Sequence, residues 1–148
     1  MARDTLATLI KVRRLACDDA QRKLVKALTD EGRAEKIVHE AERTIAQELE
    51  IASAPESSDA VVEAFGAWLG GARRQLDGAR RILLERRAET VRMRAELTAS
   101  RTALETVETL HEQRRQAAKR AQERGAQREL DDRPPIDGGL EREMTQSR

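Results

Sequence analysis

The chain has 148 residues, which is enough for one ordinary domain at most. Charged residues make up 37% of it and aromatic residues only 1%, so these side chains cannot build the thick central core of a globular protein. The formal net charge is +1, so the chain as a whole is not a polyanion binder.

The first half of the chain carries apolar residues every seven positions, on two registers of one helix face. A 3.5-residue apolar period sustained over several heptads predicts a coiled coil, and we expect a helix from about residue 3 to residue 52. Glu31 is the one charged member of the first register. The apolar members are Ile10, Cys17, Leu24, Val38, Ile45 and Ala52 on one register and Leu6, Ala20, Ala27, Ala34 and Ala41 on the other.

Residues 53–58 interrupt this repeat. Pro55 cannot continue a helix, while Ser57, Ser58 and Asp59 are favourable N-caps for a second helix, expected from about residue 59 to residue 130. Prolines and glycines then predict a disordered tail over residues 133–148. The seam of the second helix consists of Val62, Leu69, Leu76, Leu83, Thr90, Leu97 and Leu104, with Phe65, Ala72, Ala79, Met93, Ser100 and Val107 as partners.

A short turn between two long helices favours an antiparallel arrangement. The sequence therefore predicts an all-α fold over residues 1–132, an antiparallel two-helix coiled-coil hairpin in which helix 2 is longer than helix 1. With the turn centred on residue 55, Ala34 faces Leu76 and Ala27 faces Leu83. The acidic stretch of helix 1 is expected to pair with the arginine-rich start of helix 2. The end of helix 2 is expected to project alone.

No combination of residues suits catalysis, metal binding or a cofactor. A metal site needs clustered ligands, and the hairpin places His39 and His111 far apart. Adjacent carboxylates such as Asp18 and Asp19 lie on a solvated helix, without the enclosed site that acid–base catalysis needs. Cys17 falls on the seam and is expected to be a small buried residue. We therefore expect no enzyme, no metal and no cofactor.

Targeting and nucleic-acid signals are weak as well. There is no apolar leader and no segment long enough to span a membrane, so we expect a cytoplasmic protein without direct membrane insertion. Arginine doublets occur at 13–14, 73–74, 80–81, 86–87 and 114–115. Interleaved aromatic residues for stacking on single strands are missing, and the acids of helix 1 offset the charge, so nucleic-acid binding is not expected.

The two aromatic residues, Phe65 and Trp68, lie three positions apart close to the turn. Phe65 falls on the seam, whereas Trp68 falls one position beside it and is expected to be partly exposed. Two interpretations remain open. Trp68 is an interface anchor beside small residues that admit another chain, or both rings close the tip of the hairpin.

Several short patterns occur in order between residues 3 and 132: Leu6-x-x-Leu9, Asp19-Ala20-x-x-x-Leu24, Phe65-Gly-Ala-Trp68 followed by Leu76, Ala103-Leu104-Glu105, Glu112-x-Arg114-Arg115 and Glu129-Leu130-Asp131-Asp132. In spacing and charge the chain resembles the FliJ family, the small coiled-coil components of the flagellar type III export apparatus. Counterparts of this family serve virulence secretion systems.

The resemblance implies a non-catalytic stalk, similar to the rotor stalk of rotary ATPases, that couples a hexameric export ATPase to the export gate membrane protein and escorts export chaperones. It also implies peripheral association with the inner-membrane export apparatus. The gate would be met by Phe65, Trp68 and Ala72, although the family usually has a Tyr before its Phe and a larger apolar residue at the position of Ala72. The ATPase would be met by Lys11, Arg13, Arg14, Arg114, Arg115, Lys119 and Arg120.

Two other functions are compatible with the same residues. A generic coiled-coil scaffold or adaptor protein that forms homo-oligomers is favoured if the chain is an extended dimer. A nucleic-acid-associated protein would show binding that depends steeply on salt.

Overall fold

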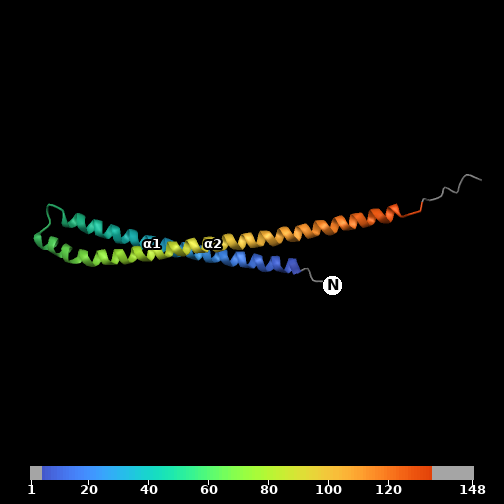
Figure 1. Ribbon diagram of the computed structural model, residues 1–148. Coiled ribbons are helices and arrows are strands. Elements are labelled where there is room, and N and C mark those ends of the chain that lie inside the picture. Colours follow the sequence, from blue (N-terminus) through green and yellow to red (C-terminus); the bar gives the residue numbers. More distant parts are fainter. Residues whose placement is uncertain (1–4, 135–148) are drawn as a thin grey trace, which may run out of the picture. The chain divides into compact units, whose positions relative to one another are not determined.

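The computed structural model describes residues 5–134, which form two long helices joined by a turn (Figure 1). Helix α1 spans Thr5–Ala52 and helix α2 spans Asp59–Asp131, with 48 and 73 residues respectively. The chain divides into two compact units, residues 1–107 and residues 108–148. Most of the predicted disordered tail lies outside the described residues.

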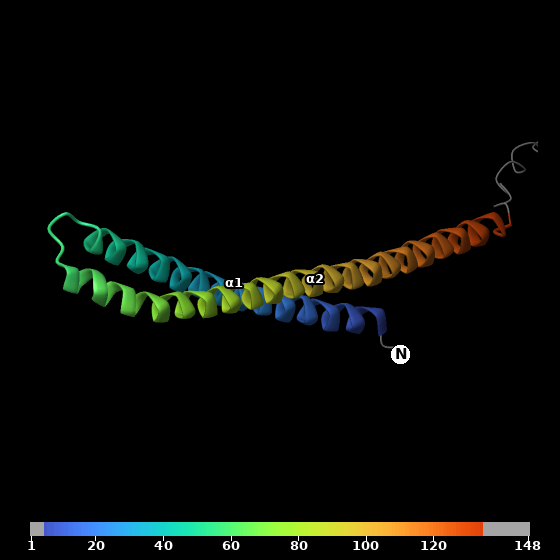
Figure 2. The ribbon, with the colours of Figure 1, turned by 60° about the vertical axis from the view of Figure 1, so that its left-hand side comes forward.

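Within the first unit, α1 and the part of α2 up to Val107 run antiparallel and side by side (Figure 2). The chain is therefore an antiparallel two-helix coiled-coil hairpin, with α2 longer than α1, as the apolar repeat predicted. Within the second unit, the described residues continue α2 to Asp131.

The turn satisfies the backbone groups that the two helix ends leave free. The amide of Ser53 donates to the carbonyl oxygen of Leu49 at 2.9 Å, and the hydroxyl of Ser57 donates to the carbonyl oxygen of Ile51. At the start of α2, the carbonyl oxygen of Ser58 accepts from the amide of Val62 at 3.2 Å. These bonds anchor residues 53–58 to both helices.

The buried side chains of the hairpin all belong to the predicted seam. Small residues of α1 face leucines of α2, which lets the helices approach closely. The hydroxyl of Thr90, the one buried polar residue among those described, donates to the carbonyl oxygen of Arg86 at 3.2 Å. The buried set is Leu6, Ile10, Ala20, Ala27, Ala34, Val38 and Ala52 in α1, and Leu76, Leu83, Thr90 and Leu97 in α2.

The register of the two helices differs from the predicted one. Lys23 Nζ lies 3.2 Å from Glu96 Oε1, and Arg80 Nη2 lies 2.9 Å from Glu42 Oε1, whereas a turn centred on residue 55 places positions 87 and 68 opposite them. The predicted pairing was wrong because the apolar repeat alone does not fix the register. Moving one helix along the other by a whole heptad brings seam positions opposite seam positions again. The charged flanks distinguish the registers, since the predicted one sets Glu42 against Trp68, which carries no charge.

Val62 and Cys17 are among the seam residues that are more exposed than the repeat predicted. Val62 is 50% exposed, because in the observed register α1 ends before it reaches the level of the first turn of α2. Cys17 is half-buried, so it is not the enclosed apolar residue that its seam position suggested.

Candidate protein-interaction surfaces

One flank of the hairpin is closed by ion pairs between the helices. Arg80 contacts Glu42 at 2.9 Å, and Arg87 contacts Glu35 at 3.4 Å and Glu31 at 3.9 Å. The predicted pairing of acidic α1 with arginine-rich α2 is thereby confirmed. All five side chains keep substantial solvent contact, so each pair contributes about 0–1 kcal/mol, and their main effect is on the register.

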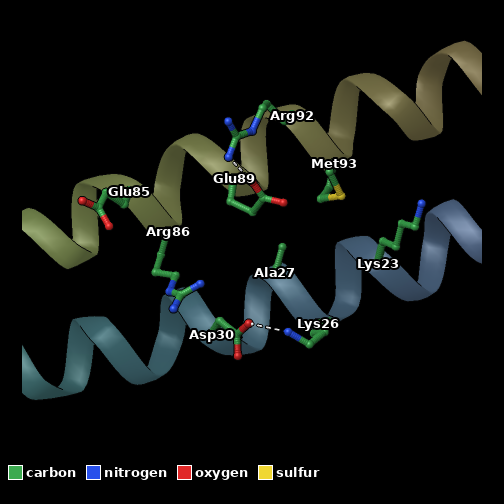
Figure 3. A pocket seen from close by; sticks show the side chains of 9 residues that line it. All are labelled: Lys23, Lys26, Ala27, Asp30, Glu85, Arg86, Glu89, Arg92 and Met93. Carbon is green, nitrogen blue, oxygen red and sulfur yellow. Dashed lines mark hydrogen bonds and ion pairs between the residues drawn. The ribbon is translucent and has the colours of Figure 1, made fainter.

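The other flank contains a groove in which charged side chains of both helices meet (Figure 3). Lys26 Nζ lies 3.1 Å from Asp30 Oδ2 on α1, and the guanidinium of Arg92 contacts Glu89 on α2. The side chain of Arg86 extends from α2 toward Asp30 (Figure 3). The residues that line the groove are Lys23, Lys26, Ala27, Asp30, Glu85, Arg86, Glu89, Arg92 and Met93.

In two of the residues that line this groove, Asp30 and Lys23, hydrogen bonds and neighbouring charges shift the pKa toward the charged form. The hydrogen bond from Lys26 holds the pKa of Asp30 below its usual value, and the charges of Arg86 and Arg33 act in the same direction. The hydrogen bond to Glu96 raises the pKa of Lys23 above its usual value. Both side chains therefore present charge to the solvent at this groove.

The basic residues predicted to meet an ATPase are all exposed. Lys11, Arg13 and Arg14 lie on α1 in the unit of residues 1–107, and the others lie on α2 in the unit of residues 108–148. In the second unit, every residue from 112 to 134 is exposed, and Arg115 Nη1 lies 3.9 Å from Glu112 Oε2. The role of these residues as ATPase contacts stays a prediction. The members in the second unit are Arg114, Arg115, Lys119 and Arg120.

The three residues predicted to meet an export gate differ in accessibility. Phe65 and Ala72 are half-buried at seam positions, whereas Trp68 is 39% exposed. The rings of Phe65 and Trp68 have centroids 5.9 Å apart and planes inclined by 40°. Phe65 is therefore partly enclosed near the turn and Trp68 presents part of its ring to solvent, which leaves both interpretations of the pair open. A gate contact stays a prediction.

Three exposed isoleucines beside the seam were not predicted as functional residues. Ile37 is 57% exposed, Ile51 is 56% exposed and Ile82 is 51% exposed. Ile37 and Ile51 are separated by two whole heptads, and so are Trp68 and Ile82. This spacing of whole heptads could have identified these residues from the sequence, but the stronger apolar repeat of the adjacent seam concealed the spacing.

Other kinds of site find no support within the described part of the chain. Between residues 5 and 134, no group of three or more His, Cys, Asp and Glu side chains is placed to hold a metal ion. His39 is exposed, with Nδ1 at 3.8 Å from Glu42 Oε2. Over the same residues, neither helix has a stretch apolar enough to cross a membrane.

Comparisons of the chain with protein-family models, with curated proteins and with solved structures find no match.

Proposed function

We propose that this chain is a non-catalytic coiled-coil hairpin that acts by binding other proteins along its surface. The observation that carries the proposal is the row of exposed apolar side chains beside an already filled seam, Trp68 and Ile82 on α2 and Ile37 and Ile51 on α1. Exposed aromatic and aliphatic side chains grouped on a charged surface are typical of protein interfaces.

In its specific form, we propose that the partner is the hexameric ATPase of a type III export system, with the hairpin as a FliJ-like stalk. The antiparallel coiled coil and the exposed basic side chains of Arg114, Arg115, Lys119 and Arg120 support this function. A stiff rod with different charges on different sides would present each ATPase subunit with a different surface. It would thereby transmit the state of the ring to the export gate and hold free export chaperones, without chemistry of its own.

The test is a pull-down of the full chain with the export ATPase encoded in the same genome. A variant with Arg114, Arg115, Lys119 and Arg120 changed to Glu is expected to lose the ATPase. The control variant reverses four other exposed arginines, none of which forms an ion pair among residues 5–134, and is expected to keep it. If both variants bind the ATPase equally, the ATPase contact does not lie in this segment of α2. The control positions are Arg22, Arg73, Arg94 and Arg101.

A homo-oligomeric scaffold is the second candidate function. Leu9, Val12 and Leu15 near the start of α1 are 37%, 56% and 66% exposed, and such residues also suit contact between copies. Light scattering separates the two candidates. A dimer that does not bind the ATPase would replace the stalk with the scaffold.

A further inference from the structure

Exposed and half-buried residues beside the seam form a second seven-residue repeat along α2. Its uncharged members follow one another at spacings of three and four residues, the pattern with which a helix packs against a partner helix. The first such seam of α2 is filled by α1, whereas this stripe remains accessible, with Val61 and Trp68 each 39% exposed. The stripe comprises Val61, Ala64, Trp68, Gly71, Gly78 and Ile82, with Gln75 as its polar member.

Helix α1 supplies the other edge of the same flank. The ion pair between Lys23 and Glu96, at 3.2 Å, joins the two helices across it. Whole heptads lead from Lys23 along α1 to Ile37 and Ile51, and from Glu96 back along α2 to Ile82. The flank is therefore charged near Lys23 and apolar toward the turn.

The opposite flank is more highly charged over the middle of the hairpin. There Glu42 pairs with Arg80 and Glu35 pairs with Arg87, so both helices present charges at the levels where the first flank presents Ile37 and Ile82. At the level of Ile37 and Ile82 a partner helix therefore meets apolar side chains on the first flank and charges on the opposite one, whereas closer to the turn the register of Glu35 and Glu42 reaches Leu49, which is 50% exposed.

The border of the stripe is positively charged. Four exposed cations lie along its sides and form no ion pair among residues 5–134, whereas Glu40 and Glu50 bring negative charge to the sides and Glu85 and Glu89 bound its end beyond Ile82. The guanidinium of Arg74 lies over the small residues, 3.7 Å from the Cβ position of Gly70 and 3.8 Å from that of Gly71. The cations are Lys36 and Arg43 on α1 and Arg74 and Arg81 on α2.

We propose that this stripe is the docking site of an acidic amphipathic α-helix from another protein. Its apolar face would pack on Trp68, Ile82 and the open space beside Gly78, and its carboxylates would meet the bordering cations, among them Arg74, whose guanidinium lies over Gly71. A second copy of this chain fits less well, because its own cations would face those of the first. The inference rests on the protein-binding function proposed above, but not on the export ATPase as the partner.

The probe is a synthetic four-heptad peptide with leucine and alanine at its seam positions and glutamate on its flanks, and without tryptophan. Trp68 is the only tryptophan of the chain, so its fluorescence reports directly on the stripe. Titration of the full chain is expected to give a saturable blue shift that weakens as salt increases. A matched peptide with lysine in place of glutamate is expected to give no shift.

Two glycine variants locate the contact. A Cβ added at Gly78, on the stripe, or at Gly66, off the stripe, meets no atom within 4 Å, so neither variant is expected to disturb the hairpin. Gly78→Gln is expected to weaken peptide binding about tenfold or more, because the side chain blocks close packing. Gly66→Gln is expected to bind like the unchanged chain, and circular dichroism checks the helicity of both.

Three outcomes would overturn the inference: equal binding by the two glycine variants, equal binding of the lysine peptide, or a Trp68 shift that follows the concentration of the chain alone and coincides with a dimer in light scattering. If the chain binds the ATPase but not the acidic peptide, the inferred docking site is wrong and the proposed function stands.

Discussion

Leu83 and Leu84 are neighbours in α2 with opposite environments, which makes them a matched pair for testing the seam. Leu83 is 7% exposed and packs in one cluster with Ala34, Val38 and Leu76, whereas Leu84 is 65% exposed. Truncation of a buried leucine to alanine costs about 2–5 kcal/mol, depending on how far the surroundings collapse. This core is only two helices thick and open to solvent at its edges, so for Leu83→Ala we expect about 2–3 kcal/mol.

Leu84→Ala is expected to change the free energy of unfolding by about 0.5 kcal/mol or less, since an exposed side chain loses little contact when truncated. Urea unfolding followed by circular dichroism measures both variants, and an unchanged m-value would show that the difference lies in the stability of the hairpin. If Leu84→Ala lowers the free energy of unfolding as much as Leu83→Ala does, the face of α2 that packs against α1 is not the one that contains Leu83.

Three further perturbations test the packing and the flanks. Gly78→Ala is expected to raise the free energy of unfolding by up to about 1 kcal/mol, because its Cβ meets no atom within 4 Å, and a lower urea midpoint would contradict this. Because the pKa of Asp30 is lowered, its stabilising contribution exists above the usual carboxyl pKa and is lost as pH falls through the folded-state value. The pKa of Lys23 is raised, so its contribution exists below the usual amine pKa and is lost as pH rises through the folded-state value. Asp30→Asn should remove the first of these losses from a pH series of melting curves. A double-mutant cycle on Arg80 and Glu42, 2.9 Å apart but both substantially exposed, should give a coupling of about 0.2–1 kcal/mol that declines with salt, and a coupling that does not respond to salt would speak against a solvent-screened pair.

The seam and the break were predictable from the sequence because both have strong local causes. A seven-residue repeat dictates which face of a helix is apolar, and Pro55 cannot continue a helix. The register was not predictable from the repeat, because shifting one helix by a heptad leaves the seam unchanged. It depends on weaker terms at the flanks, such as Glu42 meeting Arg80 in preference to Trp68.

Surface roles were harder to predict than the fold, since an exposed side chain with no partner in its own chain carries little positional information. Arg114 and Arg120 illustrate this: both are exposed, as predicted, yet exposure does not say what they contact. The stripe through Trp68 and Ile82 did leave a trace in the sequence, as a second spacing of three and four beside the first. A helix with two such repeats has two apolar faces, and in a two-helix hairpin the partner helix covers only one of them.

A net charge of +1 conceals a directional surface on this hairpin. The carboxylates of Glu31, Glu35 and Glu42 are engaged by Arg80 and Arg87 on one flank, and that pairing neutralises much of the acidic stretch of α1. Four of the cations that form no ion pair among residues 5–134, Lys36, Arg43, Arg74 and Arg81, border the apolar stripe on the other flank. Intramolecular pairing therefore does more than fix the register: it engages much of the acidic stretch of α1 on the first flank, and the apolar stripe with its bordering cations stays accessible on the flank where we expect an acidic helix to dock.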